Sequence, residues 1–344
     1  MAASDAKREG MRVCWPEHGR AELAPFSVPD PKPGEVLVRS EMTLISPGTE
    51  RAFFLGLPNA QSRFPCYPGY SNIGRVIALG EAGARAAGGE PLGVGDRIAT
   101  AASHASHALA RADRCWKVPD RLVPEEAVYF NLASIALQGV RKARLELGEP
   151  ALVLGLGLIG NLALQLARLQ GAFPIIGLDL DAGRRAMASR CGADIVLDPS
   201  AAGTPEAMAG ATDGRGPSVV IEATGSAEAV NVALGLAAAH ARVVLLASTR
   251  GVTEANFYRD VHQKGLVVLG AHASTVPPHD SSPGYWTRGD DTRTALRLLA
   301  AGRLEVAALT SERFPWREAP RAYDVLASWR KDVLGMLLRW DEES

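Results

Sequence analysis

The sequence predicts an α/β protein in which an N-terminal antiparallel β domain is followed by a doubly wound parallel sheet. Three observations support this prediction. A strand, a glycine-rich turn, a helix and a second strand follow one another over residues 151–179. Apolar strands alternate with helical patterns through the second half of the chain, whereas short alternating segments between Pro and Gly residues fill the first. The length of 344 residues suits two domains.

Composition narrows the classes of function. Hydrophobic residues make up 47% of the chain and the formal net charge is −1, so we expect neither nucleic acid nor a membrane surface as a partner. No transmembrane-length apolar run and no signal peptide is visible. The four cysteines are scattered without a CxxC pair, which favours a reducing compartment over a disulfide framework or zinc cluster. We therefore expect a cytoplasmic protein.

From Met11 to about Asp120, turn residues separate short alternating segments, which predicts an antiparallel β domain that is partly closed as a barrel. The clearest strands in it are 35–39, 74–79 and 96–100. From about Pro124 the pattern becomes helical, and we expect one helix over 125–144.

Six apolar segments of the second half are expected to form the parallel sheet. They are 151–154, 175–178, 195–197, 219–222, 243–247 and 266–269. After an irregular stretch, helices are expected at 291–301 and 320–328. The strand-like segment 335–340 is expected to return to the first domain and complete it. The predicted domains are therefore 1–132 with 271–344, and 133–270 between them.

The segment 151–179 has the pattern of a dinucleotide-binding βαβ unit, with three glycines in GxGxxG spacing. Gly155 permits the tight turn. Gly157 lets a pyrophosphate approach the backbone, and Gly160 lets the helix pack closely on the strand. The flanking strands and helix make this pattern much more specific than an isolated glycine triplet.

An acidic residue follows the second strand of this unit. Asp179 stands where a carboxylate can accept both hydroxyls of an adenosine ribose and would repel a 2′-phosphate. The backbone N–H groups of Leu158 and Ile159, at the start of the helix, favour the phosphates together with the helix dipole. We therefore expect NAD (NADH) as the cofactor in preference to NADP(H).

Over nearly its whole length, the chain resembles the medium-chain dehydrogenases/reductases of the alcohol and polyol dehydrogenase type. The segments that carry the resemblance are GEVLVRSEMTLISPGTE (34–50), FPCYPGYSNIGRVIALG (64–80), VGDRIA (94–99), GLGLIG (155–160), IIGLDLD (175–181), VVIEATGS (219–226) and ARVVLLAS (241–248). The resemblance implies a GroES-like barrel with an inserted Rossmann domain, a small-molecule substrate, and a dimer or tetramer, of which we expect the homodimer. It also places Thr224 and Gly225 in the cofactor site.

The zinc enzymes of this family hold their catalytic metal through residues that this chain lacks. Pro47 stands at the place of the family's Cys ligand, Tyr70 at that of its His ligand, and Asn131 or a neighbour at the third place. Proline cannot ligate zinc, and tyrosine and asparagine are poor ligands. The four-cysteine lobe that holds a structural zinc is missing as well. The resemblance with these departures implies a member that needs no zinc or other metal.

Without a metal, another group must donate and accept the proton as hydride moves. Tyr70 is the first candidate, if a cation or the nicotinamide lowers the pKa of its phenol; the alternative is that it is a wall residue. Ser46, Thr49 and Glu50, on a neighbouring loop, are candidates for relaying the proton or binding hydroxyls. Alternatively, Thr49 and Glu50 only cap a helix that begins at Arg51.

Two histidines and two loops complete the candidates. His104 and His107 lie where relatives carry a barrel strand, and a structural role is the commoner one for such residues. Segments 256–264 and 272–286 flank the last sheet strand, where loops line ligand crevices. The second is polar and aromatic, which suits a sugar or cyclitol, unless it is a solvated surface loop.

The leading hypothesis is an NAD(H)-dependent oxidoreductase that interconverts a secondary alcohol and a ketone on a polar, sugar- or cyclitol-like molecule. An enoyl or quinone reductase is an alternative, against which Asp179 argues because those relatives mostly use NADPH. An epimerase or lyase that retains NAD, and a cofactor-binding protein without catalysis, also remain open.

Overall fold

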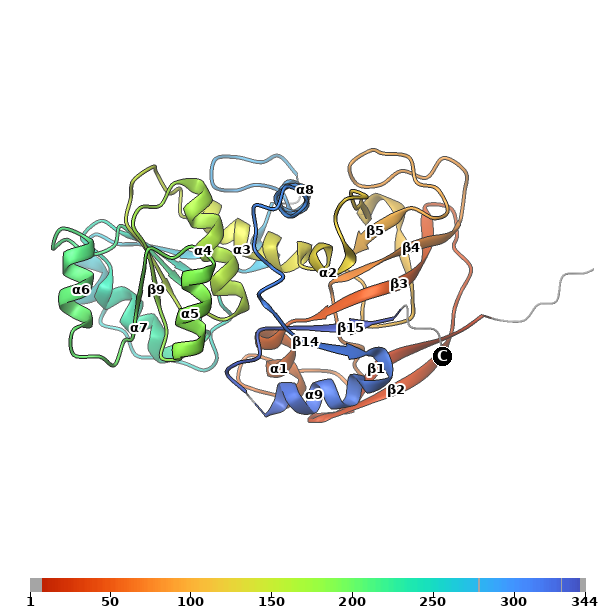
Figure 1. The fold of residues 1–344 in the computed structure, drawn as a ribbon, viewed down its shortest axis with the longest axis horizontal. Helices are drawn as coiled ribbons and strands as arrows, with labels where there is room; N and C mark the ends of the chain where they lie inside the picture. Colours follow the sequence, from red (N-terminus) through yellow and green to blue (C-terminus); the bar gives the residue numbers. More distant parts are fainter. Residues whose placement is uncertain (1–7, 278, 329, 341–344) are drawn as a thin grey trace, which may run out of the picture. The chain divides into compact units, whose positions relative to one another are not determined.

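The structure is a computed structural model that describes residues 8–277, 279–328 and 330–340. The chain divides into two compact units, whose elements are labelled in Figure 1. Unit 1 consists of Met1–Asn131, Leu296–Ala301 and Thr310–Ser344, and unit 2 of Leu132–Ala295 and Gly302–Leu309. Within the described ranges, no helix has the length and apolar character needed to cross a membrane.

Unit 1 is built on a seven-stranded sheet with the order β14-β15-β3-β4-β5-β7, in which β6 pairs with β3 outside this path. Its strands are β3 (Glu35–Ile45), β4 (Asn72–Leu79), β5 (Arg97–Thr100), β6 (His107–Arg111), β7 (Trp116–Lys117), β14 (Thr310–Pro315) and β15 (Gly335–Arg339). A separate antiparallel pair is formed by β1 (Glu9–Glu17) and β2 (Arg20–Ser27).

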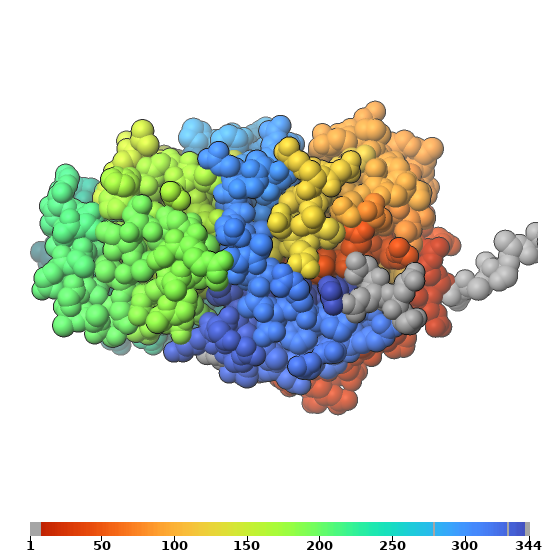
Figure 2. Space-filling model, in the orientation of Figure 1, coloured from red at the N-terminus to blue at the C-terminus, as the bar shows by residue number. Residues whose placement is uncertain are grey.

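The strand β3 organises unit 1. It pairs antiparallel with β4, with β6 and, through its last residues, with β15. The predicted return of the C-terminal segment to the first domain is thus confirmed, and Figure 2 shows the blue C-terminal segment lying against the red N-terminal one. The expectation of a wholly antiparallel domain is wrong in one respect. The strand β14, which the sequence analysis missed, pairs with β15 in parallel.

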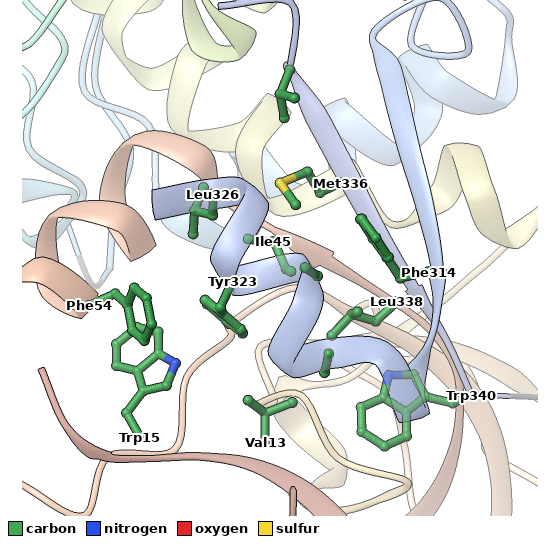
Figure 3. Packing of buried hydrophobic residues seen from close by; sticks show 13 residues of the cluster. Val13, Trp15, Ile45, Phe54, Phe314, Tyr323, Leu326, Met336, Leu338 and Trp340 are labelled. Carbon is green, nitrogen blue, oxygen red and sulfur yellow. The ribbon is translucent and has the colours of Figure 1, made fainter. Parts of the chain in front are cut away.

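An aromatic core lies in unit 1 between α1 (Pro47–Leu55) and α9 (Ala319–Ala327) (Figure 3). The ring of Trp15 lies 5.3 Å from the ring centroids of both Phe54 and Tyr323, and all three side chains are fully buried. The helix α9 presents its buried residues at the spacing of one helical face. These residues are Ala319, Ala322, Tyr323 and Leu326. The polar hydroxyl of Tyr323 is therefore carried into an apolar interior.

Unit 2 contains a six-stranded parallel sheet in the doubly wound order β10-β9-β8-β11-β12-β13. Its strands are β8 (Ala151–Leu154), β9 (Ile175–Leu178), β10 (Ile195–Leu197), β11 (Val219–Glu222), β12 (Arg242–Leu245) and β13 (Val267–Gly270). The bounds predicted for the first four are confirmed, whereas β12 begins one residue earlier and β13 one residue later than expected. Besides α1 and α9, the α-helices of the two units are α2 (Pro124–Ala127), α3 (Phe130–Lys142), α4 (Leu158–Gln170), α5 (Ala182–Arg190), α6 (Thr204–Ala211), α7 (Ala227–Leu236) and α8 (Arg288–Ala300).

The single helix expected over 125–144 is instead two helices, α2 and α3. Tertiary contacts hold the turn between them. The carbonyl of Val128 accepts a hydrogen bond of 2.5 Å from the Ser71 hydroxyl, and the Tyr129 hydroxyl lies 2.8 Å from Thr310 Oγ1. The periodic apolar pattern runs through this turn, so it could not reveal the break.

The segment from residue 271 to Ala295 belongs to unit 2, although the sequence analysis assigned it to the first domain. Side chains of α3 hold it there. Lys142 Nζ donates to Thr275 Oγ1 at 2.9 Å, and Arg141 Nη1 lies 2.5 Å from Asp291 Oδ1. The other boundary, after Asn131, lies one residue from its expected position.

Candidate cofactor site and active site

The glycine turn of unit 2 joins β8 to α4 and has the shape that its sequence predicts. Gly155 has φ 92°, and a Cβ there would lie 2.8 Å from the Thr224 nitrogen. A Cβ on Gly160 would lie 1.8 Å from the carbonyl oxygen of Gly155, so helix and turn touch through their backbones. A Cβ on Gly157 would meet nothing within 4 Å. The turn is therefore tightly packed behind Gly155 and Gly160 and open at Gly157.

The start of α4 is arranged to receive an anion. Leu158 and Ile159 are its first two residues, and Gly157 precedes them without a side chain that could cap the helix. Asn161, which the sequence analysis missed, is fully buried and donates through Nδ2 to the carbonyl oxygens of Leu156 (2.6 Å) and Gly157 (3.1 Å). These bonds hold two carbonyl groups of the turn in place.

Asp179 follows β9 and binds the turn itself. Its Oδ2 accepts the Leu156 N–H at 2.8 Å, and its Oδ1 accepts the Asp181 N–H at 2.8 Å. Arg184 Nη1, from the first turn of α5, lies 3.9 Å from the same Oδ2. The carboxylate thus lies beside the glycine turn, with each of its oxygens bonded to a backbone N–H, and it has a cationic neighbour that the sequence analysis did not consider.

Thr224 and Gly225 are held by a buried glutamate. Glu222, the last residue of β11, accepts the Thr224 N–H through Oε1 at 2.7 Å, and the Thr224 hydroxyl donates to the same oxygen. Burial raises the pKa of the Glu222 carboxyl. Because Thr224 lies against Gly155, this carboxyl braces the loop after β11 against the glycine turn. The sequence analysis used the segment VVIEATGS, which contains this glutamate, but only the fold shows what the carboxyl group binds.

The four predicted catalytic residues of unit 1 do come together. Ser46 and Thr49, at the start of α1, form side-chain hydrogen bonds with the Tyr70 hydroxyl, and the charge of Glu50 acts on the same phenol. Burial and Glu50 raise the pKa of Tyr70 to about 12. The expectation of a lowered pKa is therefore not met by the protein's own groups, because the nearby charge is an anion.

The helix α1 begins at Pro47, not at Arg51 as the capping alternative assumed. Its N-cap is Ser46, whose side chain makes no capping bond. Glu50 instead reaches back within the first turn and accepts the Ser46 N–H through Oε1 at 2.8 Å. Glu50 thus has a helix-start role in addition to its place beside Tyr70.

Glu50 binds two further donors, both of them buried. His104 Nε2 lies 3.0 Å from Glu50 Oε2, and the Tyr323 hydroxyl donates to that oxygen at 2.5 Å. Gly69 lies against His104, since a Cβ on it would come within 2.8 Å of the imidazole. His104 was one of the two histidines considered as candidates from the sequence. Tyr323 was missed, because nothing in the local pattern of α9 distinguishes this tyrosine from a core aromatic residue.

His107 and the two substrate-loop candidates have other surroundings. His107 Nδ1 lies 3.0 Å from Ser106 Oγ, and burial lowers the pKa of this imidazole. In the loop after β13, the rings of Tyr285 and Trp286 lie over cations of α3, with Arg141 4.3 Å from the Trp286 centroid. The segment before β13 forms a short π-helix at Tyr258–His262. The two aromatic residues of the later loop are thus engaged by unit 2 itself.

A family model described as zinc-binding dehydrogenase matches residues 159–288. The chain is 31% identical over 210 residues to D-guloside 3-dehydrogenase of Shigella flexneri, an alignment that covers 60% of this chain and only 59% of that protein. It is 30% identical over 272 residues to L-threonine 3-dehydrogenase of Thermococcus kodakarensis, with 70% of this chain and 75% of that protein covered. The chain belongs to the medium-chain dehydrogenase/reductase superfamily of oxidoreductases.

A solved structure supports the same membership for the whole chain. A protein of Sinorhizobium meliloti described as a zinc-binding dehydrogenase, bound to NADP, superposes with a TM-score of 0.81 at 26% identity. The superposition covers 97% of this chain and 100% of that one. The fold predicted from the resemblance, a GroES-like domain with a Rossmann domain, is thereby confirmed.

The residues at the family's zinc positions do not suit zinc in this member of the superfamily. Pro47 begins α1 and offers no ligating atom. Asn131 Nδ2 donates to the Tyr70 carbonyl oxygen at 2.5 Å, so its amide is directed at the backbone. Within residues 8–277, 279–328 and 330–340, no three His, Cys, Asp or Glu side chains are grouped so that they could hold a metal ion.

Proposed function

We propose that this chain is an NAD(H)-dependent oxidoreductase that interconverts a secondary alcohol and a ketone on a polar, sugar- or cyclitol-like small molecule. The observation that carries the proposal is the glycine turn between β8 and α4, tight behind Gly155 and Gly160 and open at Gly157. Relatives named as D-guloside 3-dehydrogenase and L-threonine 3-dehydrogenase act at secondary alcohols of polar molecules, which supports the substrate class.

The cofactor would be held by groups of unit 2. The start of α4, at Leu158 and Ile159, suits the pyrophosphate, and Asp179 suits the adenosine ribose. When bound, a nicotinamide supplies or accepts the hydride. Thr224 and Gly225 form the loop that Glu222 braces against the turn.

Tyr70 is proposed as the proton donor and acceptor. With a pKa of about 12, its phenol keeps its proton at neutral pH and can donate it to the oxygen of a carbonyl substrate during reduction. Ser46 and Thr49 orient this hydroxyl through their hydrogen bonds. In the oxidation direction, the phenol has to release its own proton before it can accept the proton of the alcohol. Ser46 and the partly exposed Thr49 are proposed to relay the released proton to solvent water.

The reaction is proposed to need no zinc. The reason is the donor chemistry at Pro47, Tyr70 and Asn131, together with the three hydrogen bonds that already engage the Glu50 carboxylate. Elemental analysis of the purified protein should find less than stoichiometric zinc, and chelators should leave activity intact. One tightly bound zinc per chain would refute this part of the proposal.

NADP(H) is the second candidate cofactor. It would favour the alternative function of an enoyl or quinone reductase, because those relatives mostly use NADPH. Two observations favour it: Arg184 lies 3.9 Å from Asp179, and the Sinorhizobium meliloti relative is bound to NADP. The deciding experiment is a fluorescence titration with NADH and NADPH, followed by a screen of polyols, sugars and cyclitols with absorbance of the reduced cofactor as readout. Turnover of enones but not of alcohols would replace the leading proposal.

A homodimer is also proposed, and its support is the outer edge of the parallel sheet. The strand β13 ends the sheet order, and its Val267 and Val268 are 49% and 40% exposed. An apolar edge strand is a site at which another strand can pair. Size-exclusion chromatography with light scattering tests this, and a charged residue at Val268 should weaken the association. The cytoplasmic location stays a prediction.

A further inference from the structure

Two buried residues outside the proposed chemistry, His104 and Tyr323, bind one carboxylate. Glu50 accepts hydrogen bonds from Ser46 N–H (2.8 Å), His104 Nε2 (3.0 Å) and the Tyr323 hydroxyl (2.5 Å). We propose that His104 and Tyr323 are positioning residues, which hold Glu50 as an ionised carboxylate beside Tyr70 and thereby keep the Tyr70 phenol protonated. This inference rests on the proposed role of Tyr70 as proton donor.

The donors around Glu50 determine its charge state. An ionised carboxylate only accepts hydrogen bonds, whereas a protonated one would direct its own O–H at a neighbour. Here one donor reaches Oε1 and two reach Oε2, from the backbone, from the loop before β6 and from α9. The position in the first turn of α1 adds the favourable end of the helix dipole. All of these interactions favour the anion.

The same geometry assigns the tautomer of His104. Its Nδ1 is buried and has no hydrogen-bond partner among the described residues. An imidazolium would leave a charged N–H group unpaired there, at a high desolvation cost. The neutral tautomer with its proton on Nε2 leaves only a lone pair unpaired and points its N–H at Glu50. His104 therefore donates to the carboxylate without neutralising its charge.

The charge that Tyr70 experiences comes from Glu50. The titratable groups packed around this site are Glu50 on α1, His104 before β6, Tyr323 on α9, and Cys66 on the segment of Tyr70 itself. Burial raises the pKa of both the Cys66 thiol and the Tyr323 phenol, so both are neutral. One anion beside a phenol disfavours tyrosinate, so Tyr70 stays a neutral phenol that carries its proton until a substrate binds.

The test uses the whole protein without cofactor or substrate. Tyr70 is replaced by a fluorotyrosine, whose more acidic phenol titrates while the protein stays folded, and its ¹⁹F signal is followed against pH. The alkaline step reports the phenol, and we expect Glu50→Gln to lower its midpoint by about one pH unit or more. An unchanged midpoint would overturn the proposal.

Tyr323→Phe keeps the ring and removes one donor, so it tests the cluster even if Glu50→Gln does not fold. The alkaline midpoint of Tyr70 should fall, because the carboxylate that raises it has lost a hydrogen bond that holds it in place. Tyr129→Phe is the matched control, since Tyr129 is another buried tyrosine of unit 1 with one hydroxyl partner, Thr310. It should leave the alkaline midpoint of Tyr70 in place. Equal behaviour of the two variants would mean that Tyr323 is only structural.

A kinetic experiment separates this inference from the proposed function. With any substrate found in the screen, Tyr323→Phe should lower kcat about tenfold or more, while KM for the cofactor stays within about twofold. If Tyr70→Phe keeps full turnover while the ¹⁹F midpoint moves as expected, the role of Tyr70 fails and the charged cluster stands. If the ¹⁹F midpoint does not move, the cluster fails, whatever the turnover.

Discussion

The glycine turn of unit 2 and the hydroxyl cluster of unit 1 are constructed in opposite ways. The turn is a backbone structure, in which the lack of side chains at Gly155 and Gly160 lets strand, turn and helix touch. The cluster is a side-chain structure, in which hydroxyl, imidazole and carboxylate groups from several segments bind one another. Cofactor binding at the turn should therefore be weakened when an atom is added, and proton transfer at the cluster should be impaired when an atom is removed.

The largest effect on cofactor affinity is expected from adding one carbon to the turn. In Gly160→Ala, the new Cβ would lie 1.8 Å from the Gly155 carbonyl oxygen, so the turn itself has to move. We expect NADH affinity to fall by at least about 100-fold, equivalent to about 2.8 kcal/mol. Fluorescence titration with NADH measures it.

Gly157→Ala is the matched control for that change. Its Cβ would meet nothing within 4 Å, and Gly157 has φ −68°, which any residue adopts. The thermal midpoint should stay as in the wild type while NADH affinity drops, because the added methyl group enters the open space beside the helix start. Wild-type affinity in Gly157→Ala would show that the open space is not the cofactor's.

The next effect comes from removing one oxygen from the cluster. Tyr70→Phe should lower turnover by roughly 10² to 10⁴ and leave NADH affinity unchanged. Because the pKa of the phenol is about 12, turnover in the reduction direction should not decline with deprotonation of Tyr70 between about pH 6 and 9. Near-normal turnover in the variant would assign Tyr70 to the wall of the site and move the proton path to Ser46 or Glu50.

The difference between a backbone turn and a side-chain cluster explains how much of each site the sequence could predict. The turn is contiguous, so its glycines, the strand before it and the helix after it could be recognised from residues 151–179 alone. The cluster depends on long-range contacts, and Tyr323 lies 273 residues from Glu50 along the chain. The pattern of α9 shows that Tyr323 is buried, but no local signal shows which polar group its hydroxyl meets.

The break between α2 and α3 escaped prediction for the same reason. It is held by a hydroxyl of Ser71, far away in sequence, and the helical periodicity continues across it. The parallel strand β14 was missed because its pairing with β15 depends on where the chain returns, which local propensity does not encode. Side-chain chemistry and most elements were thus predictable, whereas most tertiary partners, apart from the return of β15 to β3, were not.

A smaller effect, on the choice between the two cofactors, is expected at Asp179. It binds the turn through the Leu156 N–H and would discriminate cofactors through its charge. The wild type should bind NADH more tightly than NADPH by at least about 2 kcal/mol, or roughly 30-fold. Asp179→Asn should narrow this gap, and Arg184→Ala should widen it by removing a cation 3.9 Å away. Equal affinity for both cofactors in the wild type would contradict the assignment.

The smallest effect is expected at Glu222, the buried carboxyl of unit 2. Unlike Glu50, it has donors on Oε1 only, and its Oε2 is buried without a hydrogen-bond partner among the described residues. Burial raises its pKa in the folded protein, so the folded state binds this proton more tightly than the unfolded chain does. The stabilisation from that proton is fully present below the unfolded value and is lost as the pH rises through the folded value.

Glu222→Gln should therefore behave as a near-neutral replacement. Its amide oxygen can accept the Thr224 donors, so NADH affinity should stay within about threefold of the wild type. Urea unfolding at a series of pH values should show that the wild type gains stability relative to the variant as the pH falls toward about 4.5. Glu50→Gln should cost far more at neutral pH, because its new NH₂ group would face a donor. If both substitutions cost the same, burial rather than the number of donors governs these carboxyls.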